Sequence, residues 1–165
     1  MKEHSIRLVR KEDYDSIWEI FDSVIKTGDT YVFSPNTSKS DMSDLWMADQ
    51  MHTYVLESKG KILGTYFIKP NHPDLGSHIA NAGYMVHPDY HGQGIGKLLC
   101  EHSMAEAEKH GFIAMQFNLV VSTNEGAIKL WQKYGFRIIG TIPKAFDHQS
   151  LGLVDAHIMY KDLKQ

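Results

Sequence analysis

The sequence predicts an α/β fold of the α+β kind, in which helices pack on a mixed β-sheet. Short β-rich runs alternate along the chain with segments whose apolar residues recur at helical spacing. Two of these runs, at 79–86 and 115–121, are separated by a single helical segment, the pattern of a right-handed β-α-β crossover between parallel neighbours. A length of 165 residues is that of one domain, so we expect residues 1–165 to fold as a single unit.

The first half of the chain is expected to supply two helices and a hairpin. Asp13 is placed to cap a helix whose apolar residues follow at helical spacing. Ser40 or Asp41 is placed to cap a second helix. The β-rich runs of this half lie at 6–9, 53–56 and 62–68, and the last two flank the turn signal Ser58-Lys59-Gly60.

The second half is expected to alternate strands and helices. Pro88 ends the strand at 79–86, and a helix follows the glycine cluster and ends near Gly111. Another helix is expected to start in Ser122-Thr123-Asn124-Glu125 and to run to Tyr134, with Gly135 as its stop. One face of the helix after the glycine cluster carries Ile95, Leu98, Leu99, His102 and Ala105. The remaining strands are expected at 115–121, 136–141 and 154–160.

Composition excludes several classes of protein. Lys and Arg total 17 against 20 Asp and Glu, a net charge of −3, whereas nucleic-acid binders normally carry a basic excess. No apolar run approaches the roughly 18 residues needed to span a bilayer, and the first residues lack the apolar segment of a secretory signal. A single cysteine, Cys100, fits a reducing compartment. We therefore expect a cytoplasmic protein with neither nucleic acid nor membrane as partner.

The most informative segment is a glycine loop between a strand and a helix. Gly92, Gly94 and Gly96 alternate immediately before the apolar helix, where they let the backbone approach a ligand closely. The free N–H groups at the start of the helix then favour an anionic group such as a diphosphate. A P-loop would need glycine where His91 stands, and a dinucleotide fingerprint would need glycine where Lys97 stands. Both alternatives fail.

Two segments resemble the signatures of the GNAT superfamily of N-acetyltransferases. His91-Gly92-Gln93-Gly94-Ile95-Gly96 is similar to the acetyl-CoA motif Arg/Gln-x-x-Gly-x-Gly/Ala. The segment at 124–136 is similar to the second signature, Asn-x-x-Ala-x-x-Leu-Tyr-x-x-x-Gly-Phe. The resemblance implies a mixed sheet of about seven strands flanked by about four helices, and direct acetyl transfer from acetyl-CoA to an amine. It implies coenzyme contacts at Met85, Val86, His91, Gly92, Gln93, Gly94, Ile95, Gly96, Lys97, Asn124 and Trp131.

The resemblance also implies how the sheet contacts the coenzyme. The strand that includes Tyr84 and Val86 is expected to diverge from its neighbour, so that its backbone N–H groups bind the acetyl carbonyl and the pantetheine arm. Two positions depart from the family pattern. His91 replaces Arg or Gln, and Trp131 replaces the tyrosine that often protonates the departing thiolate; an indole N–H has no useful acidity. Tyr134 follows three residues later and is expected mainly to pack.

A narrower resemblance concerns residues 115–124 and 140–146. Both are similar to fungal acetyltransferases of azetidine-2-carboxylate and related imino acids, in which asparagines serve the substrate. The matching positions are Asn81, Asn118 and Asn124, which the resemblance implies as catalytic residues. Because the strand at 79–84 carries no carboxylate, we expect Asn81 and Asn118 to orient a water that takes the amine proton. A helix cap for Asn124 and a buried, satisfied amide for the other two remain open alternatives.

Acceptor binding and other chemistry can be assigned only in outline. Tyr31, Phe33, Trp46 and Tyr66, with Asn81 and Tyr84, are candidates for the acceptor pocket, although such aromatic residues are often core. Cys100 has no base nearby in sequence and is expected to be a packed thiol. The histidines show no metal-ligand spacing, so we expect no metal site.

The sequence therefore predicts an acetyl-CoA-dependent N-acetyltransferase of a small amine, with an amino or imino acid as acceptor. One alternative is acetylation of a protein or peptide amino group. Another is a catalytically silent regulatory module that binds coenzyme A. A homodimer is possible, because dimers are common among the proteins that the chain resembles.

Overall fold

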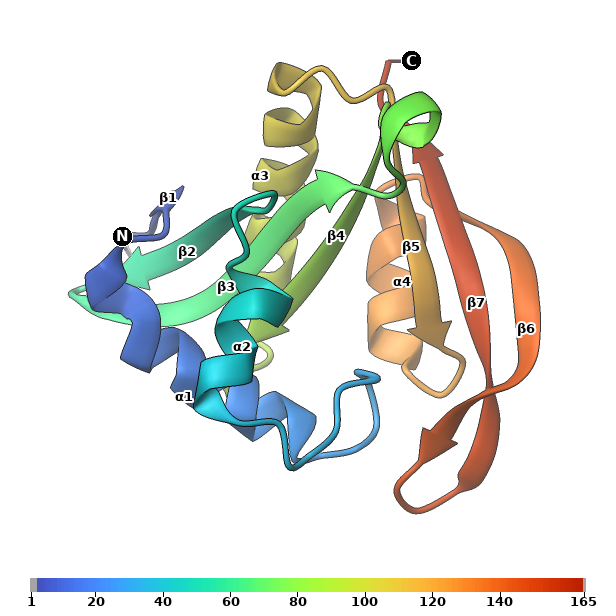
Figure 1. Ribbon diagram of the computed structural model, residues 1–165, viewed down its shortest axis with the longest axis horizontal. Helices are drawn as coiled ribbons and strands as arrows, with labels where there is room; N and C mark the ends of the chain where they lie inside the picture. The colour runs from blue at the N-terminus through green and yellow to red at the C-terminus, as the bar shows by residue number, and fades with distance from the viewer. Residues whose placement is uncertain (1–2, 165) are drawn as a thin grey trace.

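A computed structural model describes residues 3–164, which form one mixed sheet with helices on both faces (Figure 1). The sheet has seven strands in the order β1-β2-β3-β4-β5-β7-β6. The strands are β1 (Ser5–Leu8), β2 (His52–Ser58), β3 (Lys61–Pro70), β4 (Ile79–Val86), β5 (Ala114–Val121), β6 (Arg137–His148) and β7 (Gly152–Asp162). The α-helices are α1 (Tyr14–Ile25), α2 (Lys39–Trp46), α3 (Ile95–Lys109) and α4 (Glu125–Lys133).

The parallel pair at the centre of the sheet is the β-α-β unit that the sequence predicts. Strands β4 and β5 are parallel and are joined through α3. Their pairing covers only three positions and ends where Asn81 pairs with Gln116. Beyond that pair the two strands diverge, which leaves one edge of the second half of β4 without a neighbouring strand (Figure 1). The expected divergence of β4 is confirmed.

Two apolar clusters hold the helices on the sheet. One packs α1 and α2 on one face and includes Ile17, Phe21 and Trp46. The other packs α3 and α4 on the opposite face and includes Leu99 and Trp131. Complete burial of one large apolar side chain stabilises a fold by about 1.5–3 kcal/mol, so both layers are firmly attached to the strands between them.

Several local expectations about the helices need correction. Asp13 stands at the N-cap of α1 but does not cap it, because its carboxylate accepts hydrogen bonds from the Arg7 guanidinium and the Arg10 N–H. Ser38, rather than Ser40 or Asp41, caps α2. On α3, Ala105 is exposed, and the buried face comprises Ile95, Leu99, Cys100, Ser103 and Ala107.

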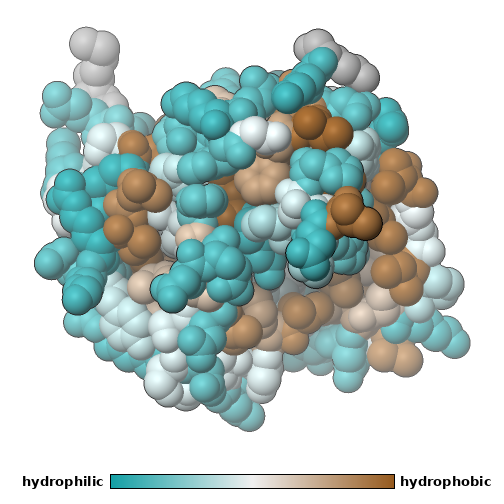
Figure 2. Space-filling model, turned by 45° about the horizontal axis from the view of Figure 1, so that its top comes forward, coloured by the Kyte–Doolittle hydropathy of each residue, from teal (hydrophilic) through white to brown (hydrophobic). Residues whose placement is uncertain are grey.

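The last two strands are longer than the sequence indicates. β6 continues through Pro143 to His148, and the register with β7 shifts between Ile142 and Phe146. Proline is tolerated there because β6 is an edge strand and the shift removes the need for its N–H. Exposed apolar side chains gather along this edge, on the right of Figure 2; they are Ile138, Ile139, Ile142, Leu151 and Leu153.

Candidate active site

The glycine loop forms one wall of a groove. Gly92 and Gly94 have φ values of +74° and +80°, and no heavy atom lies within 4 Å of a Cβ built on either. The first bond inside α3 is donated by Leu98 N to Gly94 O, so the N–H groups of Ile95, Gly96 and Lys97 have no partner within the helix. Ile95 and Gly96 line an open hollow at the positive end of this 15-residue helix, and free amides at such an end suit a diphosphate.

Most of the residues expected to hold the coenzyme line this groove. The lining includes Met85, Val86, His91, Gly92, Gly94, Ile95, Gly96, Asn124 and Trp131. Gln93 and Lys97 are not among the lining residues. The Gln93 amide donates to Asp89 O, and the Lys97 ammonium lies 3.9 Å from Glu101. The His91 ring turns back toward the strand, and its Nε2 hydrogen-bonds to Val86 O at 3.2 Å. An exposed imidazole in this position does not reproduce the arginine of the family motif.

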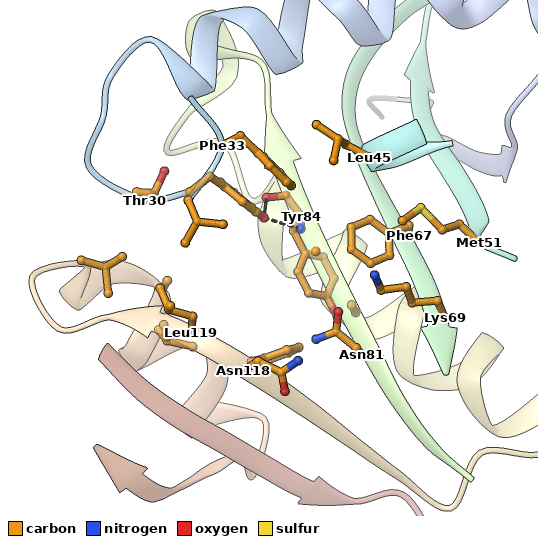
Figure 3. Close-up of a pocket in the computed structure, with 18 of the residues that line it drawn as sticks. Thr30, Phe33, Leu45, Met51, Phe67, Lys69, Asn81, Tyr84, Asn118 and Leu119 are labelled. Carbon is orange, nitrogen blue, oxygen red and sulfur yellow. Dashed lines mark hydrogen bonds between the residues drawn. The ribbon is translucent and has the colours of Figure 1, made fainter. Parts of the chain in front are cut away.

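A cavity of about 380 Å³ adjoins the groove, on the side of α1 and α2 (Figure 3). The two hollows share part of their lining, where β4 and β5 diverge. A site of this size is at the small end of the range for small-molecule pockets. The shared lining consists of Thr30, Tyr31, Tyr84, Asn124, Ala127 and Trp131.

Tyr31 occupies the open edge of β4 at this border. Its hydroxyl donates to Tyr84 O at 2.5 Å and accepts from Tyr84 N at 2.7 Å. Burial raises the pKa of Tyr31, so the hydroxyl stays protonated and remains a donor. The backbone N–H of Tyr84 is therefore engaged, contrary to the expectation that it is free for a ligand. The backbone N–H of Val86, two residues further along β4, points to the same open edge, because successive N–H groups of a strand alternate between its two edges.

All three predicted catalytic asparagines line the cavity, held by different bonds. Asn81 Nδ2 donates to Gln116 O at 3.0 Å, which fixes the amide plane. Asn118 accepts from Gln116 Nε2 at 3.0 Å. Asn124 Oδ1 accepts from Ala127 N at 3.4 Å as the N-cap of α4, so the prediction that this residue caps a helix is confirmed. Asn124 also belongs to the lining that the groove and the cavity share.

Of the aromatic candidates for acceptor binding, Tyr31, Phe33 and Tyr84 line the cavity. Tyr66 does not, and its assignment to the acceptor pocket is corrected. Its ring is fully buried on the α3 side of the sheet, where the hydroxyl hydrogen-bonds to His102 Nδ1 at 2.6 Å. Trp46 is also fully buried and donates its Nε1–H to Thr65 Oγ1. On β3 it is Phe67, one residue beyond Tyr66, that faces the cavity.

The remaining reactive groups lie outside the site. Burial raises the pKa of Cys100 to about 12, so this thiol is protonated and packed at neutral pH. Tyr134 packs against the α3–α4 cluster, donates to Glu101 and lines neither hollow. Within residues 3–164 no group of three or more His, Cys, Asp or Glu side chains could hold a metal ion. No helix in the same range is long and apolar enough to cross a membrane.

Sequence reasoning did not identify Lys69, Leu45 and Met51, which also line the cavity. Lys69 stands at the polar end of an apolar run, two residues after Phe67, and strand alternation could have placed both on one face. Leu45 and Met51 lie in and just after α2. No sequence signal shows that α2 covers this part of the sheet.

The profile of the Acetyltransferase (GNAT) family matches residues 14–136. The chain belongs to this family. A GCN5-related N-acetyltransferase from Kribbella flavida is 37% identical and superposes with a TM-score of 0.92, over 96% of this chain and 97% of that one. The predicted fold and the predicted acetyltransferase class are thereby confirmed.

Other relatives share parts of the chain or its fold. N-acetyltransferase aca1 of Schizosaccharomyces pombe is 38% identical over 67% of this chain, which spans only 54% of that protein. The [ribosomal protein bS18]-alanine N-acetyltransferase of Escherichia coli K12 is 39% identical over 45% of this chain and 49% of its own length. The structure of yncA from Salmonella typhimurium, solved with its cofactor acetyl-CoA, has the same fold at 21% identity, with a TM-score of 0.87 over 99% of this chain and 95% of that one.

Proposed function

We propose that this chain transfers the acetyl group of acetyl-CoA directly to the amine of a small molecule, an amino or imino acid. The observation that supports this most strongly is the meeting of the glycine-loop groove and the adjoining cavity at one shared border. An acetyl donor in the groove and an amine in the cavity would be held side by side there. Such placement makes the attack effectively unimolecular.

The hydrogen-bond donors of the groove are chemically suited to the coenzyme. The amides of Ile95, Gly96 and Lys97 would hold the diphosphate, and the backbone of Val86 would hold the pantetheine arm. When bound, acetyl-CoA supplies a thioester whose carbonyl is open to attack by an amine. The Tyr84 N–H becomes available to that carbonyl only when the Tyr31 hydroxyl moves away.

The amine proton needs an acceptor, since an α-amine, whose pKa is about 8 at a peptide terminus and higher beside a free carboxylate, is largely protonated at neutral pH. No carboxylate lies on β4. The Asn81 Nδ2–H is bonded to Gln116 O, which leaves Asn81 Oδ1 to accept from an amine or from a water that carries the proton to solvent. Trp131 cannot protonate the thiolate, but a thiol whose pKa is about 8.5 leaves without a strong acid.

The acceptor class follows from the narrower resemblance. Residues 115–124 and 140–146 resemble azetidine-2-carboxylate acetyltransferases, and Asn81, Asn118 and Asn124 all line the cavity, as that resemblance implies. The second candidate is a peptide amino group, which the name of the Escherichia coli relative favours. The third is a silent module that binds coenzyme A, which the absence of a tyrosine at position 131 favours.

We further infer a cytoplasmic protein in which residues 1–165 act as one domain. The buried single cysteine is compatible with a reducing compartment. A homodimer is supported by the apolar side chains exposed along β6 and β7.

A screen of acceptors tests the proposal. Release of the coenzyme A thiol is followed with acetyl-CoA and a panel of L-amino acids, proline analogues, simple amines and a peptide beginning with alanine. We expect turnover with the amino or imino acids, and acetylated product by mass spectrometry. Turnover restricted to the peptide would favour the second candidate, and tight coenzyme binding with no turnover would favour the module.

A further inference from the structure

Lys69 places a positive charge inside the acceptor cavity. It lies on β3, and its ammonium nitrogen sits 5.6 Å from the centroid of the Phe67 ring, over the ring face. Phe67 is itself held edge-on against Trp46 at 4.8 Å and is almost completely buried. The cation therefore rests on a fixed aromatic platform, and in Figure 3 the Lys69 side chain reaches toward Asn81.

This cation has no carboxylate partner among residues 3–164. The one acidic residue in the lining of the cavity is Asp44 on α2, and no ion pair joins its side chain to Lys69. Every other lining residue of the cavity is uncharged. A cation within an aromatic and aliphatic pocket is partly desolvated, so an anion that binds beside it gains more than it would at the open surface.

Lys69 stands beside a row of neutral amide side chains that are hydrogen-bonded to the backbone and to one another. In the sheet register Lys69 pairs with Asn81, and Asn81 pairs with Gln116, so the three side chains form a row on one face. The row lies at the last paired position of β4 and β5, immediately before the strands diverge. The amide groups of Gln116, Asn118 and Asn71 continue it through hydrogen bonds of 3.0 and 2.7 Å.

We propose that Lys69 binds the carboxylate of the acceptor, which makes the enzyme specific for free amino and imino acids over peptide N-termini. The inference rests on the proposed function. A carboxylate at Lys69 would place the α-amine near Asn81, on the way to the shared border with the groove. Phe33, Leu45 and Met51 would pack against the aliphatic part of the acceptor. A peptide N-terminus has a neutral amide where a free amino acid has its carboxylate.

The test compares each acceptor with its neutral carboxamide, and the variants separate the effect of Lys69 from the lower pKa of the amine in the carboxamide. L-Azetidine-2-carboxylate, L-proline and L-leucine are each paired with their carboxamides, and kcat/KM is measured for the native chain and for Lys69→Met, Lys69→Arg and Lys61→Met. Lys61 is an exposed lysine at the other end of β3 and serves as the matched control. We expect the native chain to prefer the carboxylates by about tenfold or more, the usual size of a charge-assisted contact.

In Lys69→Met the ratio of kcat/KM for the carboxylate to that for the carboxamide should fall toward one, mainly because KM for the carboxylate rises. The preference should persist in Lys69→Arg and Lys61→Met. Equal use of carboxylate and carboxamide by the native chain, or an unchanged preference in Lys69→Met, would overturn the assignment.

Failure of the proposed function would look different, because no amino or imino acid and no carboxamide of one would then be acetylated by any variant. Calorimetry still decides the role of Lys69 in that case. Binding of L-azetidine-2-carboxylate to the coenzyme A complex, weakened about tenfold or more in Lys69→Met, supports it. No binding to the native chain, or equal binding to both, overturns it.

Discussion

The Tyr31 hydroxyl is hydrogen-bonded to both backbone groups of Tyr84, donating to the carbonyl and accepting from the N–H. A strand edge normally satisfies such groups with a neighbouring strand, and here β5 has already diverged. One side chain from the loop between α1 and α2 thus takes the place of a strand. The same position on β4 is where an acetyl carbonyl would need a donor, so Tyr31 and the coenzyme compete for the Tyr84 N–H.

Tyr31→Phe tests this competition. Loss of the hydroxyl leaves two backbone groups without a partner, so we expect the free energy of unfolding to fall by about 1–3 kcal/mol. Acetyl-CoA, which carries the carbonyl that competes with Tyr31, should then raise the melting temperature more in the variant than in the native chain, because no hydroxyl has to leave the strand edge. Tyr14→Phe is the control, since it also removes a hydroxyl bonded to a backbone carbonyl, that of Lys39, outside the site. An equal rise in the native chain and Tyr31→Phe would contradict the competition.

Gly94→Ala tests the glycine loop. Gly94 has a φ of +80° with open space around it, so alanine there causes backbone strain of about 1–2 kcal/mol without a collision. Gly111, at the other end of α3, has a φ of +86° and equally open space, which makes Gly111→Ala a matched control. Both variants should melt at similar, lower temperatures. Only Gly94→Ala should raise the dissociation constant of coenzyme A, by about fivefold or more, as measured by calorimetry; equal affinities would remove the loop from coenzyme binding.

Asn81→Ala tests the proton path. The variant loses the oxygen that orients the amine or its water, so we expect kcat to fall by about 100-fold with acetyl-CoA binding retained. Asn36→Ala, in an exposed loop, should keep the native rate. Steady-state kinetics on the best acceptor of the screen provides the measurement. A native kcat in Asn81→Ala would exclude Asn81 from the reaction.

Acid sensitivity should arise on the opposite face of the sheet. Burial lowers the pKa of His102, and the neutral ring accepts from the Tyr66 hydroxyl. A histidine with a lowered pKa contributes its stability above the unfolded value of about 6.5 and loses it as the pH falls. The melting temperature should therefore decline between pH 7 and 5, less steeply in His102→Gln than in the native chain. His72→Gln, in an exposed loop, should follow the native profile; identical slopes in all three would refute the assignment.

The sequence predicts most clearly the elements whose boundaries are marked by special residues. The strand at 79–86 is correct to the residue because Pro88 stops it. Helix α4 is identified because Asn124 caps it and Gly135 follows its end at a φ of +89°. The glycine loop is identified because Gly92 and Gly94 adopt positive φ values, a conformation that residues other than glycine rarely adopt. Seven of the coenzyme positions expected from residue 91 onward line the groove: His91, Gly92, Gly94, Ile95, Gly96, Asn124 and Trp131.

Long-range placement is what the sequence alone does not determine. Residues Leu63 to Ile68 of β3 are buried on both faces, so apolar alternation cannot show that Phe67 faces the cavity and Tyr66 faces α3. The role proposed for Lys69 depends on its register with Asn81, which is set by strand pairing. Pro143 looks like the end of a strand, but an edge position with a register shift accommodates it.

The central claim is that the backbone at residues 91–97 binds the diphosphate of coenzyme A at the end of α3. A crystal structure of the chain grown with coenzyme A tests it most directly. We predict diphosphate oxygens within hydrogen-bond distance of the amides of Ile95, Gly96 and Lys97, with the thiol at the border marked by Tyr84 and Trp131. A diphosphate bound elsewhere on the molecule would contradict the account.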